Sequence, residues 1–101
     1  MVLNITAENF QKEVMECEKT VLLDFFATWC GPCRMVSPII DEIAEENDQL
    51  QVGKIDVDAQ GELAAQFHVT SIPTIVVIQN GEVINQAVGA MPKREILAML
   101  P

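Results

Sequence analysis

Two cysteines, Cys30 and Cys33, stand where an apolar stretch of the sequence meets an amphipathic one. Residues 21–28 are almost continuously apolar, which predicts a strand that is buried on both faces. Residues 31–47 carry apolar side chains at helical spacing, so we expect the chain to pass from strand to helix at Cys30. The free N–H groups and the positive dipole end of a helix N-terminus favour a thiolate there. Pro32 suits the first helical turn, because no hydrogen bond is lost at that position.

A Cys-X-X-Cys pair allows three interpretations. The first, which the strand-to-helix position favours, is a dithiol that cycles with its disulfide. The second is a zinc site, for which only Cys17 and His68 remain as further ligands, and neither belongs to a second paired motif. The third is an inert structural disulfide, but so short a loop adds little stability. We therefore expect a redox couple with no metal and no cofactor.

The composition restricts the protein's class and its partners. We expect a single domain over residues 1–101, since half of the residues are hydrophobic and can form one core. The formal net charge of −9 argues against nucleic acid and anionic membranes as partners. Three cysteines are too few for a disulfide scaffold, and we find neither a signal peptide nor an apolar run long enough to span a membrane. A reducing, cytoplasmic setting is the simplest expectation.

The periodicity along the chain predicts an α/β fold. We expect strands at residues 2–5, 21–28, 50–57, 74–78 and 82–88, and helices at residues 6–17, 31–47, 61–67 and 92–100. Thr6 can cap the first helix, and Cys17 lies on its apolar face as a packed residue rather than a reactive one. Asn80-Gly81 predicts a tight hairpin. The alternation in the first half favours a parallel sheet, to which the hairpin adds antiparallel strands at one side.

Asp24 is the most informative residue outside the cysteine motif. A carboxylate in the middle of a buried strand costs free energy unless it is paired or protonated. Its functional interpretation is a desolvated acid with a raised pKa, able to exchange a proton near the dithiol. The alternative is a carboxylate at a strand edge with backbone partners. Lys54, in the next expected strand, is its candidate partner, unless it is only an edge or surface lysine; His68 is expected to be solvated.

Pro73 precedes an expected strand, where a proline is usually a turn residue. A cis bond before it would bring neighbouring backbone groups toward the sulfurs. The sequence alone favours the trans form, because only about 5% of such bonds are cis.

The chain resembles bacterial-type thioredoxins over nearly its whole length. The matching pieces are Asp24-Phe25, Ala27, Trp29-Cys30-Gly31-Pro32-Cys33, Pro38, Lys54, Asp58, Ile72-Pro73-Thr74, Asn80-Gly81 and Val88-Gly89. The resemblance implies a five-stranded mixed sheet in the order 1-3-2-4-5, with strand 4 antiparallel and four flanking helices. It also implies that Pro73 is cis, that Asp24 takes the proton of the second cysteine, and that Lys54 lies close by.

The resemblance also implies a reaction and a set of partners. Cys30 would attack a disulfide of a client protein and Cys33 would resolve the mixed disulfide. Gly31 and Pro32 between the cysteines point to reduction rather than oxidation or isomerisation. We expect a monomer that an NADPH-dependent flavoprotein, thioredoxin reductase, recharges. The alternative is a binding module whose dithiol only switches its affinity. In either case the candidate docking surface consists of Trp29, Ile72, Pro73, Val88, Gly89 and Ala90.

One departure from the family pattern concerns Asp58. Many thioredoxins carry a tryptophan where this chain has Phe26, and that indole can donate to the aspartate equivalent to Asp58. Because Phe26 has no donor, Asp58 must find another partner or remain solvated.

Overall fold

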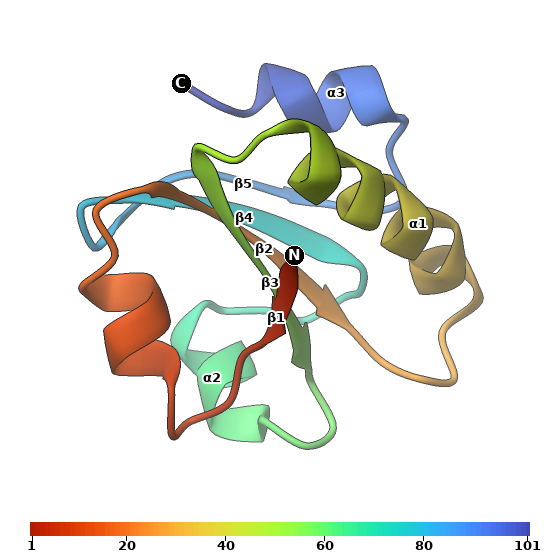
Figure 1. Cartoon of the computed structure of the whole chain (residues 1–101). Coiled ribbons are helices and arrows are strands. Elements are labelled where there is room, and N and C mark those ends of the chain that lie inside the picture. Colours follow the sequence, from red (N-terminus) through yellow and green to blue (C-terminus); the bar gives the residue numbers. More distant parts are fainter.

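A five-stranded mixed sheet forms the centre of the protein, as seen in the computed structural model, which describes residues 1–101 (Figure 1). The strand order is β1-β3-β2-β4-β5, as predicted. Strands β1, β3 and β2 are parallel, whereas β4 is antiparallel to both β2 and β5. The strands are β1 (Val2–Asn4), β2 (Thr20–Phe26), β3 (Leu50–Asp56), β4 (Thr74–Gln79) and β5 (Glu82–Val88).

Four helices cover the two faces of this sheet (Figure 1). Helices α1 (Gly31–Glu46) and α3 (Lys93–Ala98) lie on one face, and η1 (Gln11–Met15) and α2 (Gly61–Gln66) lie on the other. The predicted thioredoxin fold is therefore confirmed. None of the helices has the length and apolar character that crossing a membrane requires.

Two apolar cores, one on each face, follow from the alternation of side chains in β2. Leu23 and Phe25 point to the face where Phe67 and the residues of η1 pack. Leu22 points to the opposite face, against Ile40 of α1 and the residues of α3. By the same alternation Asp24 points to the α1 face, and this orientation places it on the side of the sheet that carries the cysteines.

The segment after β1 differs from the prediction of a regular helix over residues 6–17. It forms a turn followed by the short π-helix η1, in which the Glu16 N–H donates to the carbonyl of Gln11, five residues earlier. The Asn9 side chain accepts from the Thr6 N–H at 2.8 Å, and the Thr6 hydroxyl oxygen accepts from the Glu8 N–H at 3.3 Å, so the two side chains satisfy free backbone N–H groups at the start of this segment. The Thr6 carbonyl also accepts the first helical bond, from the Phe10 N–H at 2.9 Å, so the predicted cap at Thr6 is present although the turns that follow it are irregular. Cys17 lies beyond the helix, half-buried against the core on this face.

Two tight places in the sheet depend on glycine. Asn80 and Gly81 have φ of 53° and 76°, the left-handed values that a two-residue hairpin needs, and the predicted hairpin is confirmed. Gly53, in the middle of β3, lies under Ile5: a Cβ on Gly53 would stand 2.5 Å from the Ile5 Cγ1 atom.

Candidate active site

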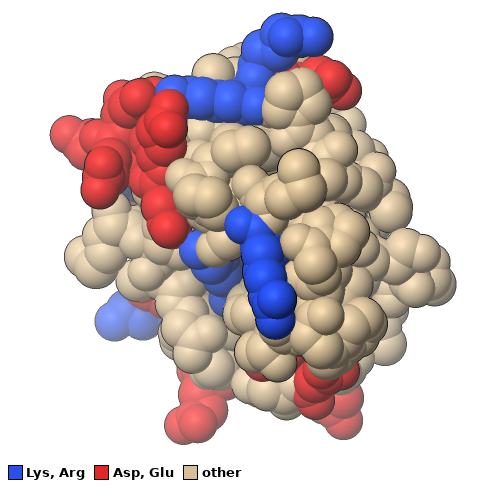
Figure 2. Space-filling view, turned by 90° about the vertical axis from the view of Figure 1, so that its right-hand side faces the viewer, with Lys and Arg blue, Asp and Glu red and all other residues tan.

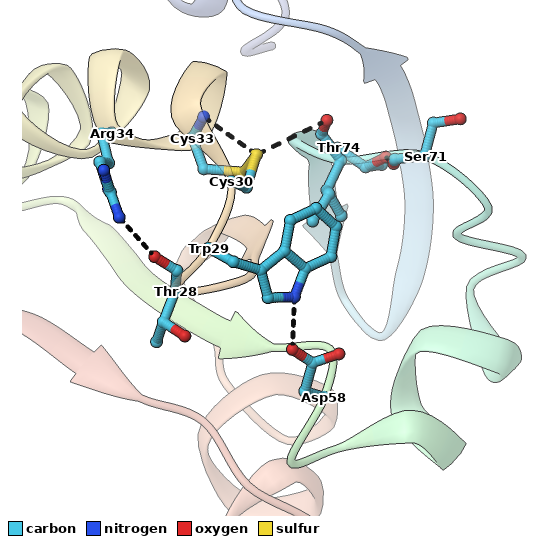
Figure 3. The surroundings of a disulfide bond; sticks show 9 residues. Thr28, Trp29, Cys30, Cys33, Arg34, Asp58, Ser71 and Thr74 are labelled. Atoms are coloured by element: carbon cyan, nitrogen blue, oxygen red, sulfur yellow. Dashed lines mark hydrogen bonds between the residues drawn. A yellow bond between two sulfur atoms is a disulfide. The ribbon is translucent and has the colours of Figure 1, made fainter.

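The two cysteines form a disulfide at the N-terminus of α1 (Figure 3). Cys30 is the N-cap residue, and its sulfur accepts a hydrogen bond of 3.2 Å from the Cys33 N–H. Both residues are almost fully buried, at 4% and 3% exposure. The first turn of α1 contains no acidic side chain, and the acidic residues of this helix begin only at Asp41. The N–H groups at the helix end therefore face the sulfurs with no carboxylate from that turn to oppose them.

The loop before β4 lies against this disulfide. The Ile72–Pro73 peptide bond is cis, as the resemblance implies and contrary to the preference of the sequence alone. The Cys30 sulfur lies 4.0 Å from the Ile72 carbonyl oxygen. The Gly89 N–H donates to the Pro73 carbonyl at 2.8 Å, so the end of β5 is fastened to the same loop. The segments around residues 30, 72 and 89, which are far apart in the sequence, therefore meet at the sulfurs.

Uncharged side chains surround the disulfide at the surface. Trp29 is 67% exposed and Val88 is 60% exposed, Ala90 is also exposed, and Ile72 is half-buried against the cysteines. Figure 2 shows the acidic side chains at the edges of this side of the molecule, while the broad area between them is mostly uncharged and includes some basic side chains. Pro73 is the exception among the predicted docking residues, because it is buried.

The partner of Asp58 is Trp29. The indole Nε1 donates to the Asp58 carboxylate at 2.8 Å, and the ring lies between the disulfide and Asp58 (Figure 3). Asp56 holds this loop, since its carboxylate accepts from the Asp58 N–H at 2.9 Å. Phe26 packs half-buried against the cysteines instead. Asp58 thus has an indole donor, and that donor is the tryptophan next to the first cysteine.

Asp24 lies in the middle of the sheet with 1% exposure, and neither of its carboxylate oxygens has a hydrogen-bond partner. The alternative of a strand-edge carboxylate is therefore wrong, because β2 pairs on both sides. Burial raises the pKa of Asp24 from 3.8 to about 6, against the opposing effect of the Lys54 charge. Such an acid changes its protonation state close to neutral pH.

Lys54 stands directly opposite Asp24 on β3, but its ammonium group contacts α1. Its Nζ atom lies 2.9 Å from the Asp41 carboxylate and 2.5 Å from the Ser37 hydroxyl oxygen. An open pocket of about 380 Å³ is lined by Lys54, Ser37, Cys33, Phe26, Ala27, Thr28 and Arg34. Neither Ser37 nor Asp41 was predicted as a site residue. The sequence nevertheless contains a signal that could have identified them. Cys33, Ser37 and Asp41 are spaced four residues apart, so they lie on one side of the helix.

His68 and Cys17, the remaining candidates, lie elsewhere. His68 follows α2 as an exposed residue with φ of 58°. Cys17 is a free thiol beside the core on the η1 face. No group of three or more His, Cys, Asp or Glu side chains is arranged to hold a metal ion. The sulfur pair at the start of α1 is therefore the reactive group that the structure shows, and Asp24 is a buried acid on the same face of the sheet as α1.

Comparison with known proteins agrees with this geometry. The model of the thioredoxin family matches residues 1–101. A thioredoxin of Streptomyces clavuligerus is 44% identical over 94 residues, which cover 93% of this chain and 88% of that protein. Thioredoxin 1 of Synechococcus elongatus is 44% identical over 90 residues, covering 88% of this chain and 84% of that protein.

A longer relative contains a second activity. The bifunctional thioredoxin reductase/thioredoxin of Mycobacterium leprae is 45% identical over 98 residues, which cover 96% of this chain but only 21% of that protein. The match over the whole chain, the sheet order and the disulfide at the start of α1 lead to one conclusion: the chain belongs to the thioredoxin family.

Proposed function

We propose that this chain reduces disulfide bonds of client proteins through the Cys30–Cys33 couple. Membership of the family together with the paired cysteines makes it a thiol-disulfide oxidoreductase that acts on disulfide substrates. The observation that carries the proposal is the disulfide at the N-terminus of α1, with Cys30 as the N-cap. The alternative of a binding module finds no support in the geometry or among the relatives.

The first step belongs to Cys30 in the reduced protein. Its thiolate attacks one sulfur of the client disulfide, a new S–S bond forms, and the other client sulfur leaves as a thiolate. The helix end supports this role, because the Cys33 N–H donates to the Cys30 sulfur and stabilises negative charge on it. Gly31 and Pro32 are both exposed and leave the approach to this turn open.

The second step belongs to Cys33 and Asp24. Cys33 gives its proton to the Asp24 carboxylate and attacks the Cys30 sulfur, which re-forms the disulfide and releases the second client sulfur as a thiolate. Two electrons have then passed from the chain to the client. A buried acid whose pKa is raised to about 6 supports this role, since it binds a proton more readily than an ordinary carboxylate. Lys54 takes a supporting role through its charge near this acid.

The uncharged area around the disulfide is the proposed docking surface. Trp29, Val88 and Ala90 are exposed there, and Ile72 and Gly89 are half-buried. Pro73 contributes through its backbone, since its side chain is buried and its carbonyl fastens Gly89. Burying such a surface supplies binding energy and does not require one particular amino-acid sequence in the client protein.

The electron source is a second part of the proposal. We expect an NADPH-dependent flavoprotein, thioredoxin reductase, to return two electrons to the disulfide. The name of the bifunctional relative, in which both activities are joined in one protein, supports this partner. We also expect the chain to act as one domain and as a monomer in a reducing, cytoplasmic compartment, where the free Cys17 thiol persists.

Trapping tests the roles of the two sulfurs. In a Cys17→Ser background, Cys33→Ser should accumulate a mixed disulfide with insulin, because its Cys30 attacks but nothing resolves the product. Cys30→Ser should accumulate little, since the remaining sulfur is more remote from the client. Mass spectrometry after acid quenching measures both. Equal trapping by the two variants would overturn the assigned order of attack.

A further inference from the structure

Lys54 and Asp24 are placed to form an ion pair, yet the structure shows none. They are register partners on the neighbouring parallel strands β2 and β3, whose backbones run about 4.8 Å apart. Side chains at such positions point to the same face, and the four-carbon stem of lysine is long enough to reach across. Asp24 nevertheless has no hydrogen-bond partner on either oxygen, and Lys54 pairs with Asp41 instead.

Two groups on α1 account for the direction of the lysine side chain. The Ser37 hydroxyl oxygen accepts from the Lys54 ammonium at 2.5 Å, and the Asp41 carboxylate lies 2.9 Å from the same nitrogen. Both contacts come from one side of the helix, since the two residues are four positions apart. They draw the positive charge toward the pocket that Cys33 and Ser37 line, away from the carboxylate under the helix.

The other surroundings of Asp24 contribute no further charge. The residue opposite it on β4 is Ile75, which is apolar and buried. From α1, Cys33 is bound in the disulfide, and Arg34 donates to the Thr28 carbonyl at 3.1 Å. On the α3 side Ile96 and Met99 are buried in the same core, and the Lys93 ammonium is held by Glu42 and Glu46. The charges that act on Asp24 are therefore those of Lys54 and Asp41.

We propose that Ser37 and Asp41 are positioning residues that hold the Lys54 ammonium on the α1 side, out of contact with the Asp24 carboxylate. The inference rests on the proposed function, in which Asp24 takes the proton of Cys33. Because Coulomb energy falls in inverse proportion to distance, a lysine held away from the acid stabilises its charged form less than a contact pair does. The pKa of Asp24 consequently stays raised, and the acid remains able to bind a proton near neutral pH.

Titration of Asp24 tests the inference directly. We would follow its carboxyl carbon by NMR in the oxidised protein, where neither active-site cysteine titrates. Asp41→Asn and Ser37→Ala each free the ammonium to approach Asp24, so the midpoint should fall by about half a pH unit or more. Asp41→Glu keeps the carboxylate and should stay near the parent value. Asp48→Asn is the matched control, since it removes the same charge at an exposed position with no side-chain contact.

A double-mutant cycle with Lys54→Met distinguishes positioning of the lysine from simple repulsion between the Asp24 and Asp41 carboxylates. Lys54→Met alone should raise the midpoint, and adding Asp41→Asn to it should lower the midpoint less than in the parent. Ser37 carries no charge, so its effect should vanish when Lys54 is absent. Equal shifts in both backgrounds, or no shift in either single variant, would overturn the inference.

Kinetic measurements distinguish a failure of the positioning role from a failure of the proposed function. If Asp24 takes the proton of Cys33, the acid limb of the pH profile for kcat in insulin reduction should move with the Asp24 midpoint, while KM stays unchanged. A midpoint that moves while the profile stays fixed would uphold the positioning role and overturn the proposed role of Asp24. A midpoint that stays fixed would overturn the positioning role itself.

Discussion

The Trp29 indole, in the loop between β2 and α1, donates a hydrogen bond of 2.8 Å to the carboxylate of Asp58, in the loop between β3 and α2. The ring is 67% exposed, yet this bond fixes its orientation beside the disulfide. An exposed aromatic side chain that is already ordered loses little conformational entropy when a partner covers it. The pair therefore orders Trp29 within the proposed docking surface.

Removing the Asp58 acceptor should loosen Trp29. In Asp58→Ala the fluorescence anisotropy of Trp29, the only tryptophan, should fall. The free energy of unfolding should change by less than about 1 kcal/mol, because the lost hydrogen bond is exposed to solvent. KM for insulin should rise more than kcat falls. Asp48→Ala, another exposed aspartate, should change none of these. An anisotropy equal to that of the parent would show that the bond does not restrain the ring.

Asp24→Asn should be more stable than the parent at neutral pH. Burial raises the pKa of Asp24 in the folded protein from 3.8 to about 6, so as the pH rises Asp24 ionises first in the unfolded chain. The stability of the parent should fall between these values and level off above them. The loss is on the order of 3 kcal/mol, since each unit of pKa corresponds to about 1.4 kcal/mol. The asparagine variant lacks this loss.

Denaturant melts of the oxidised proteins at pH 4 and pH 8 measure this difference. The advantage of Asp24→Asn should be small at pH 4 and large at pH 8, and its insulin reduction should be slower. A variant that is less stable than the parent at pH 8, with unchanged activity, would show a well-accommodated structural carboxylate and contradict the role of Asp24.

Gly53→Ala should destabilise the sheet. A methyl group there meets the Ile5 Cγ1 atom at 2.5 Å and the Leu23 Cδ2 atom at 3.3 Å, so the chain after β1 must shift. Overpacking of this kind costs about 1–3 kcal/mol. Gly61→Ala is the matched control: nothing lies within 4 Å of its added Cβ, and alanine favours the helix by up to about 1 kcal/mol. Urea unfolding measures both; equal effects would contradict the predicted close packing.

Cys17→Ser should leave disulfide reduction unchanged. The thiol is free, lies on the η1 face, and is separated by the sheet from the disulfide at the start of α1. Placing a hydroxyl against the core should cost about 1 kcal/mol of stability. Insulin turnover and a urea melt check both statements. A several-fold change in turnover with little change in stability would mean that this sulfur takes part in the reaction.

The sequence allowed most of the fold to be predicted because its strongest patterns are local. The passage from strand to helix at Cys30 and the Asn80-Gly81 turn both depend on residues next to one another, and both are found. The helix expected over residues 6–17 was predicted only in part. Its cap at Thr6 is present, but the later turn widens to a bond between residues five apart, from the Glu16 N–H to the Gln11 carbonyl, and apolar spacing does not report this.

The site was less predictable wherever its geometry depends on residues distant in the sequence. The burial of Asp24 follows from a central strand, but the direction of the Lys54 side chain depends on two residues of another element. The bond from Trp29 to Asp58 likewise needs the folded loop after β3. The cis peptide before Pro73 was implied by the family resemblance and not by the residues themselves.

The uneven distribution of charge along α1 has a consequence before any contact is made. Its acidic residues lie in its C-terminal half, from Asp41 to Glu46, while the end that carries the disulfide has Arg34 and no acid in its first turn. A partner with an electronegative surface therefore repels one end of this helix more strongly than the other. We expect such a partner to approach the end of α1 that carries the sulfurs more readily than the other end. Salt shortens the reach of this repulsion to about 10 Å at 0.1 M.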